Sequence, residues 1–334
     1  MARYNFSVLA TTPAPQAADG DFLQQFTDFA QRAERNQIDG LLIFCSHRYF
    51  DPWAVAATIL QSTKTITPLV ALQPYALAPF TAAKLIWSLT TLHHRRIDLN
   101  LITGAAKDEL DQIGEQLDHD ERYERATEYM TVVRALLSSE EPLMHDGRFY
   151  RYPGLLMYSR LDPEVRPQIF VAGSSAAGKK MAAAVADVAI THPEPVEQFA
   201  DTFSSPARQD LGTGIRIGLI ARPTKEEAWS AARTSFPEER ITRIMTAMRK
   251  RSESDWMRRL AHLATQEGVY DEVYWTGAFG KESMPTLVGT YREVADYLER
   301  YLALGVRTVI LGGTYAEEDF QHVAVVLAEL RSRE

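Results

Sequence analysis

The feature that most constrains the fold is an alternation, along the whole chain, of short apolar segments rich in β-forming residues with longer amphipathic segments. Apolar runs without internal alternation are typical of strands buried on both faces of a parallel sheet. Connections between parallel strands are right-handed, so a regular alternation winds the sheet in one direction. The chain is therefore predicted to be an α/β protein, a (β/α)8 TIM barrel with insertions, and an open doubly wound sheet is the alternative. The predicted strands cover residues 4–10, 40–45, 67–72, 99–102, 168–172, 187–191, 215–221 and 307–311.

Helices are predicted from apolar residues at helical spacing and from capping signals. Phe22 and Phe26 begin such a stripe, and Pro79 suits the first turn of a later helix. Two capping boxes, Thr224 to Glu227 and Thr290 to Glu293, mark two further starts. An Asp-Gly pair at 146–147 between β-type residues predicts a hairpin. The other predicted helices cover residues 21–35, 53–61, 79–92, 121–137 and 176–186, and a last helix follows the eighth strand.

Residues 237–287 interrupt the alternation and are predicted to be the largest insertion, between the seventh and eighth strands. The first part, 237–264, is rich in arginine and is expected to be helical throughout. The second part, 267–285, has no clear periodicity and carries Gly and Pro, which predicts a mobile lid. The whole chain, 1–334, is expected to be a single domain.

Composition excludes several classes of function. Apolar residues make up 46% and charged residues 24%, as in a globular protein with a large core. A net charge of −8 argues against nucleic-acid binding. No signal peptide and no apolar run of roughly 20 residues is recognisable, so a cytoplasmic protein without membrane contact is expected. The single cysteine, Cys45, cannot form an internal disulfide, and the histidines lack the spacing of a metal site.

Two strand ends carry polar groups. Thr103 and Gly104 end the fourth predicted strand, at the edge where barrel enzymes assemble their sites. The segment G-S-S-A-A-G at 173–178 joins the fifth strand to a helix, and a helix N-terminus with Gly and Ser can bind a phosphate. The alternative is a simple N-cap turn, because serine caps helices without any ligand.

Four stretches together resemble a known superfamily. N-L-I-T-G at 100–104, with D-H-D-E-R-Y-E-R at 118–125, is similar to the flavin-dependent, bacterial luciferase-like monooxygenases, most closely the alkanesulfonate monooxygenase branch. The stretches 69–75, 171–178 and 214–224 agree with it in order and spacing. The resemblance covers nearly the whole chain and implies the same barrel with FMN as cofactor.

The resemblance also implies a flavin site. The loop after the fifth strand would hold the flavin phosphate together with an Arg-Tyr pair, and a histidine would lie close by. Polar groups at the end of the fourth strand would meet the isoalloxazine edge, and an acid in the following loop its pyrimidine end. The implied cofactor-binding residues are Asn100, Thr103, Glu109, His119, Arg122, Tyr123, Gly173, Ser174 and Ser175. For His119 and its acidic neighbours, a solvated helix start is the alternative.

Catalytic candidates follow from matches and departures. Arg216 matches an arginine that faces substrate and peroxyflavin in the alkanesulfonate branch, and a structural ion pair is the alternative. His47 is the general base by elimination, unless it is simply exposed. Tyr315 lies one residue from a family tyrosine. Substrate contacts are assigned to Tyr49, Trp53 and Lys281, of which Tyr49 replaces a family cysteine; a family histidine is Gly218 here.

The expected function is that of a two-component monooxygenase. Reduced FMN from a separate NAD(P)H-dependent flavin reductase would react with O2 to a peroxyflavin, which oxygenates a small organic substrate. The lost polar contacts favour a substrate less anionic than a sulfonate. Two alternatives remain: a deazaflavin-dependent hydride-transfer oxidoreductase on the same barrel, and a flavin-binding protein without turnover. Relatives of this kind are usually homodimers or homotetramers.

Overall fold

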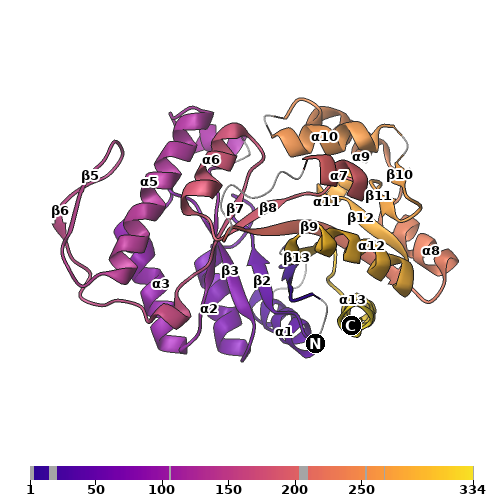
Figure 1. The fold of residues 1–334 in the computed structure, drawn as a ribbon, viewed down its shortest axis with the longest axis horizontal. Coiled ribbons are helices and arrows are strands. Elements are labelled where there is room, and N and C mark those ends of the chain that lie inside the picture. Colours follow the sequence, from indigo (N-terminus) through magenta and orange to yellow (C-terminus); the bar gives the residue numbers. More distant parts are fainter. Residues whose placement is uncertain are drawn as a thin grey trace. The chain divides into compact units, whose positions relative to one another are not determined.

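The computed structural model describes residues 4–14, 21–104, 107–202, 210–252, 254–266 and 268–333, with only the backbone of residue 107 (Figure 1). The chain divides into two compact units, each with its own interior. Unit 1 comprises Met1–Pro13, Arg32–Asp39 and Ile190–Glu334, and unit 2 comprises Ala14–Gln31 and Gly40–Ala189.

Unit 2 is built on parallel strands that pair in chain order. Its strands β2 (Gly40–Ile43), β3 (Thr67–Leu72), β4 (Asp98–Leu101) and β7 (Ile169–Ala172) pair successively. They are buried along almost their whole length, as expected for strands covered on both faces. The helices are α2 (Pro52–Ser62), α3 (Pro79–His93), α4 (Lys107–Gln112), α5 (His119–Ser138) and α6 (Ala176–Val185), with a short 3-10 turn at Pro163–Val165.

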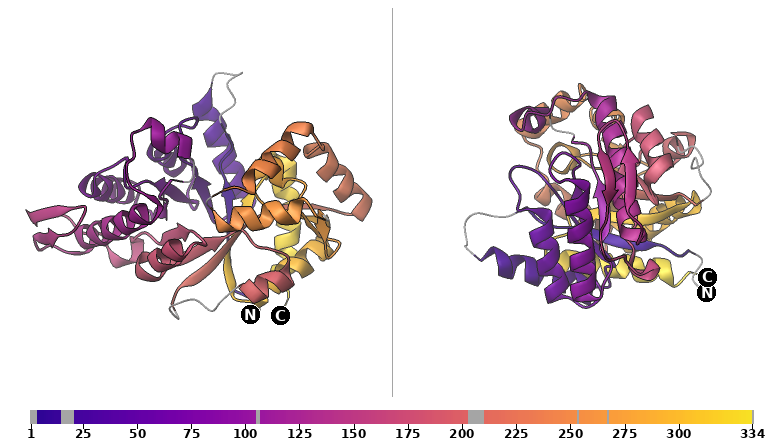
Figure 2. Two further views of the ribbon diagram at one scale, coloured as in Figure 1. Left: turned by 90° about the horizontal axis from the view of Figure 1, so that it is seen from above. Right: turned by 90° about the vertical axis from the view of Figure 1, so that its left-hand side faces the viewer.

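Within this unit, α5 packs against both α3 and α6. The predicted Asp-Gly hairpin is confirmed as the antiparallel pair β5 (Leu143–Asp146) and β6 (Arg151–Leu155), which projects beyond α5 (Figure 1, Figure 2). The contact between α5 and α6 lies at the candidate functional site.

Unit 1 contains the remaining parallel strands and the insertion. Its strands β1 (Ser7–Thr11), β13 (Val306–Gly312), β9 (Gly212–Arg222) and β12 (Thr286–Thr290) pair in that order. A hairpin of β10 (Val269–Tyr270) and β11 (Tyr274–Trp275) extends β12. The helices are α7 (Val196–Thr202), α8 (Lys225–Ser235), α9 (Arg240–Arg249), α10 (Asp255–Ala264), α11 (Phe279–Glu282), α12 (Tyr291–Ala303) and α13 (Glu317–Arg331).

With α1 (Phe22–Arg35) and β8 (Val188–Thr191), these elements complete the predicted (β/α)8 barrel, whose eight parallel strands are β1, β2, β3, β4, β7, β8, β9 and β13. Most strand limits differ from the prediction by one or two residues. The first strand begins three residues later, at Ser7, and β9 extends three residues further at its amino end. The predicted helix starts after Thr224 and Thr290 are confirmed, because each threonine caps its helix.

The insertion differs from the prediction in two respects. Residues 237–264 do not form one helix: α9 ends at Arg249 and α10 begins at Asp255. Serine explains the interruption, since the Ser252 hydroxyl accepts from the Ser254 N–H at 3.2 Å and so competes with helical hydrogen bonding. Strand β12 was not predicted because its apolar run is very short. Residues 268–285 contain the hairpin and α11, and buried Phe279 anchors them; a mobile lid stays a prediction.

Asp98 gives unit 2 a pH-dependent contribution to stability. Its Oδ1 accepts from the Gln168 N–H at 2.9 Å and lies 3.0 Å from Arg96 Nε. Burial raises the pKa of Asp98 from 3.8 to about 6, although Arg96 acts in the opposite direction. Between those two values the native state binds more protons than the unfolded chain. Stability should therefore fall as pH rises from about 4 to 6, and this contribution should be constant above that.

The substitution Asp98→Asn should remove this dependence, because an amide keeps the hydrogen bond to Gln168 without a charge. The shift of about two pKa units corresponds to about 3 kcal/mol. Urea unfolding between pH 4 and 7 measures it. Asp146→Asn is the matched control, since Asp146 is 76% exposed in its pair with Arg151. Equal pH profiles for wild type and Asp98→Asn would contradict the assignment.

Candidate functional site

The turn from β7 into α6 brings bare backbone to the start of a helix. β7 ends at Ala172 and α6 begins at Ala176, so residues 173–175 form the connection. The Ser175 hydroxyl accepts from the Gly178 N–H at 3.1 Å and caps the helix, so the N-cap alternative describes Ser175 correctly. A Cβ on Gly173 would lie 3.2 Å from the Gly178 Cα. Glycine therefore permits a tight turn, which leaves first-turn N–H groups of α6 without intrahelical acceptors.

Tyr123 faces this turn. Helix α5 begins at His119, and Asp118 and Glu121 form a capping box, with the Glu121 N–H donating to Asp118 at 2.8 Å. That start places Tyr123 on the α5 surface that packs on α6. Its hydroxyl would lie 3.1 Å from a Cβ on residue 173. A hydroxyl donor and helix N–H groups thus converge beside a position without a side chain, as an anion site requires.

Arg122 and His119 flank Tyr123. Arg122 donates from Nη1 to the Leu117 carbonyl at 3.1 Å and is half-buried, so it also fixes the loop before α5. The His119 ring lies 5.0 Å from the Tyr123 ring, and its Nδ1 is 2.7 Å from Asp120 Oδ1. The structure therefore brings Tyr123, with His119 beside it, to the turn that contains Gly173 and Ser175. Arg122 is the sequence neighbour of Tyr123 and contacts the loop before α5. Ser174 lies in the same turn, half-buried.

A second group lies at or after the carboxyl ends of β2, β3 and β4. Asn100, within β4, pairs in register with Ala71 and Phe170, and it is half-buried. No hydrogen bond of its side-chain amide occurs with any described residue. Thr103, just after β4, is 8% exposed. An amide with unused donors and acceptor beside a threonine is suited to the polar edge of a planar ring.

Glu109 and His47 meet in this group. The His47 N–H donates to Glu109 Oε1 at 3.3 Å, and the ring Nδ1 of His47 lies 3.1 Å from Gln112 Oε1. Burial, with smaller contributions from neighbouring groups that include Glu109, raises the pKa of Cys45 above 9.0 and that of Tyr75 to about 12. The raised pKa favours the protonated thiol of Cys45, which donates to Gln73 at 3.1 Å.

The two predicted aromatic substrate contacts of this unit differ in exposure. Tyr49 is half-buried, with its ring 6.1 Å from that of Phe44. Trp53 is 7% exposed and belongs to the capped start of α2, where its backbone N–H donates to Asp51 Oδ1 at 2.9 Å. Trp53 consequently presents little surface to a substrate.

Arg216 in unit 1 lies against a histidine that the sequence did not single out. Ile215 and Ile217 are fully buried, and Arg216 points from the other face of β9 as predicted. Its Nη1 is 3.4 Å from Nε2 of His192, the residue directly after β8. His192 stacks on Trp256 of α10, with ring centroids 3.6 Å apart and an interplanar angle of 10°.

The environment of His192 keeps it neutral. Burial, followed by the charge of Arg216, holds the pKa of His192 well below 6.5. Its Nε2 can then accept from the guanidinium, so a neutral ring orients a cation. Sequence reasoning missed His192 and Trp256. The available signal was the position of His192 at a strand end, the same criterion that selected Thr103.

Comparisons with known proteins identify the family of the chain. The model of the luciferase-like monooxygenase family matches residues 4–308. The chain belongs to that family. It is 43% identical, over 92% of its length and 91% of the other's, to the 4-(gamma-L-glutamylamino)butanoyl-[BtrI acyl-carrier protein] monooxygenase BtrO of Niallia circulans. The predicted family is confirmed, and with it the class of flavin-dependent monooxygenases.

Solved structures of the family share the fold. EDTA monooxygenase from Chelativorans sp. BNC1 superposes with a TM-score of 0.77 at 19% identity, covering 97% of this chain and 94% of that one. The oxygenating constituent of 3,6-diketocamphane monooxygenase from Pseudomonas putida, in complex with FMN, gives 0.69 at 17% identity, covering 99% and 98%. Among the described residues, no helix is long and apolar enough to cross a membrane.

The positions that depart from the alkanesulfonate branch have defined surroundings. A Cβ on Gly218 would lie 2.7 Å from Thr286 Oγ1, so a side chain here would require Thr286 to shift. Lys281 lies on α11, and its ammonium is 5.4 Å from the centre of the Phe236 ring. The Tyr315 hydroxyl donates to Glu282, the next residue, at 3.4 Å. Lys281 therefore belongs to this short helix of unit 1, and Tyr315 contacts it.

The neutral state of His192 can be measured directly. We expect that its ring nitrogen signals in a ¹⁵N–¹H spectrum do not titrate down to well below pH 6.5, and that Arg216→Ala raises the pKa of His192. Because the unfolded chain protonates this histidine first, its contribution to stability is present above about pH 6.5 and is lost as pH falls. His192→Phe, which keeps the stacking on Trp256, identifies the signals. A titration midpoint at or above 6.5 would contradict the assignment.

Proposed function

We propose that the protein is a two-component monooxygenase that uses reduced FMN from a separate NAD(P)H-dependent reductase and oxygenates an acyl chain carried on an acyl carrier protein. The observation that carries the flavin part is the convergence of the Tyr123 hydroxyl and the α6 N-terminus on Gly173. A phosphate dianion is the ligand that such donors and the helix dipole favour.

Each group of unit 2 has a place in this proposal. The 173–175 turn, Tyr123 and Arg122 hold the phosphate, and His119 lies beside them. Asn100 and Thr103 meet the polar edge of the ring, while Glu109, held to the His47 N–H, lies at its pyrimidine end. The reduced flavin, when bound, supplies the activation of oxygen, and the protein contributes orientation and exclusion of water.

The substrate class rests on the relative from Niallia circulans, which is similar over nearly its whole length. Glycine at position 218, where the alkanesulfonate branch is expected to carry a histidine, supports the same direction, because Thr286 leaves little room for a side chain there. We assign Arg216 to the stabilisation of negative charge on the reacting oxygen, oriented by neutral His192. His47, Tyr315 and Lys281 keep their predicted roles as general base, catalytic tyrosine and substrate contact.

Anaerobic fluorescence titration tests the flavin part, with reduced FMN, oxidised FMN and the deazaflavin F420 as ligands. Markedly tighter binding of reduced FMN, with oxygen uptake on aeration, is the expected result. Binding of F420 alone, without oxygen uptake, would instead support the hydride-transfer alternative. Binding of reduced FMN without turnover of any carrier-bound acyl chain would support a flavin-binding protein.

A further inference from the structure

Helix α9 exposes a stripe of large apolar side chains. Ile241, Ile244, Met245 and Met248 are 56%, 44%, 38% and 63% exposed. Their spacing of i, i+3, i+4 and i+7 places all four on one face of the helix. Thr246 is the one described residue of α9 that is buried. A helix of a folded domain ordinarily buries such a face, so this apolar stripe marks an interaction surface.

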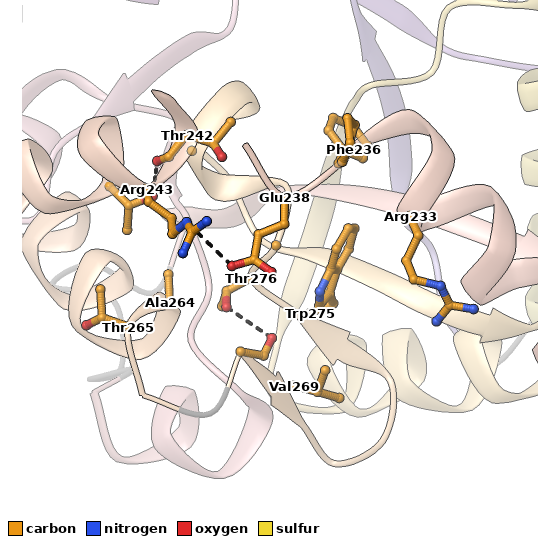
Figure 3. A pocket seen from close by; sticks show the side chains of 15 residues that line it. Arg233, Phe236, Glu238, Thr242, Arg243, Ala264, Thr265, Val269, Trp275 and Thr276 are labelled. Atoms are coloured by element: carbon orange, nitrogen blue, oxygen red, sulfur yellow. Dashed lines mark hydrogen bonds and ion pairs between the residues drawn. The ribbon is translucent and has the colours of Figure 1, made fainter. Parts of the chain in front are cut away.

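Packing within unit 1 uses the opposite side of α9. Arg249 donates to the Phe279 carbonyl and lies 5.2 Å from that ring. A Cβ on Gly280 would lie 2.7 Å from the Thr242 carbonyl, so α11 packs closely on that side. Thr242 and Arg243 also border a cavity of about 840 Å³ with Phe236 and Trp275 on its wall (Figure 3). None of the four apolar side chains lines that cavity.

A row of basic residues borders the apolar stripe. Arg240 lies along one edge, and Lys250 and Arg251 follow at its end. In the described part of the chain, Arg240 and Arg251 have no ion-pair partner, whereas Arg243, which borders the cavity, pairs with Glu238 at 3.6 Å. This cluster is locally positive in a chain whose net charge is −8.

We propose that the apolar stripe and basic row of α9 dock the acyl carrier protein, an acidic helical partner, that delivers the substrate. This inference rests on the proposed function. Acidic side chains of the partner would face the basic row, while apolar side chains of its helix would cover the stripe. A second copy of the chain fits less well, because a symmetric contact would bring two basic rows together.

Binding of the holo form of the BtrI acyl-carrier protein to the full-length chain tests the surface. We expect saturable binding that weakens with added salt. Reversal of the basic row, Arg240→Glu with Lys250→Glu and Arg251→Glu, should weaken it by at least about 10-fold. Met248→Ala with Ile244→Ala should also weaken it, without a change of charge. Arg292→Glu, whose side chain is 84% exposed on α12, is the matched control and should bind like wild type.

Turnover separates the docking surface from the proposed function. The two substrates are 4-(gamma-L-glutamylamino)butanoyl-BtrI and the N-acetylcysteamine thioester of the same acyl chain. The basic-row variant should raise KM at least about 10-fold for the carrier-bound substrate and leave the small thioester unchanged. Oxidation of neither substrate by the wild type would overturn the proposed function. Absence of holo-BtrI binding, or wild-type binding by both sets of variants, would overturn the docking surface whatever the activity.

Discussion

Replacing Arg216 with alanine is expected to lower kcat by about 10²- to 10³-fold, the usual effect of removing a preorganised charge from developing negative charge. The reason lies in how the guanidinium is held: it projects from a strand whose neighbouring side chains are fully buried, and His192 lies 3.4 Å from its Nη1. The loss should appear in turnover of the acyl thioester under saturating reduced FMN. Flavin affinity should change little, because the proposed phosphate site belongs to other elements.

Arg222 offers a control on the same strand. It is also half-buried, and its Nη1 donates to the Ala221 carbonyl at 2.9 Å, so Arg222→Ala removes a comparable side chain from β9. Its effect on kcat should be less than about 3-fold if the charge of Arg216 is what matters. Arg216→Lys should recover part of the rate, since it keeps the charge but loses the planar fork. Equal losses in Arg216→Ala and Arg222→Ala would mean that Arg216 is structural.

The barrel could be predicted from the chain because its elements are specified locally. Each strand is a short apolar run, and the threonines at 224 and 290 specify helix starts through contacts only three residues long. The insertion could not be predicted equally well. The interruption between α9 and α10 depends on one serine hydroxyl, and β12 depends on pairing with β9, which no local pattern encodes.

The candidate site shows the same division. Gly173 and Ser175 were found because a glycine-serine turn between strand and helix is a local signal, and Tyr123 because it matched a family motif. Their convergence arises from the packing of α5 on α6. His192 and Trp256 come together from distant parts of the chain, and neither stands in a recognisable motif. A side chain whose role depends on a long-range contact is therefore what sequence reasoning misses.

Replacing Ser175 with aspartate is expected to weaken binding of reduced FMN by about 100-fold while leaving riboflavin affinity within about 3-fold. Aspartate caps helices as well as serine does, so α6 should keep its start and its stability. Its carboxylate, however, would stand where the phosphate is proposed to bind. At an effective dielectric constant of about 20, two like charges a few ångströms apart repel by about 3 to 4 kcal/mol, of which solvent screening removes part.

Ser175→Asn is the matched neutral variant, since asparagine also caps and has nearly the same shape as aspartate. Anaerobic titration of all three proteins with reduced FMN and reduced riboflavin separates the causes. Loss of both flavins in both variants would indicate damage to the turn, which a lowered Tm would reveal. Equal FMN affinity for the aspartate and asparagine variants would mean that the phosphate does not bind at the N-terminus of α6. Loss confined to FMN and to aspartate is what a phosphate held beside Gly173 and Tyr123 requires.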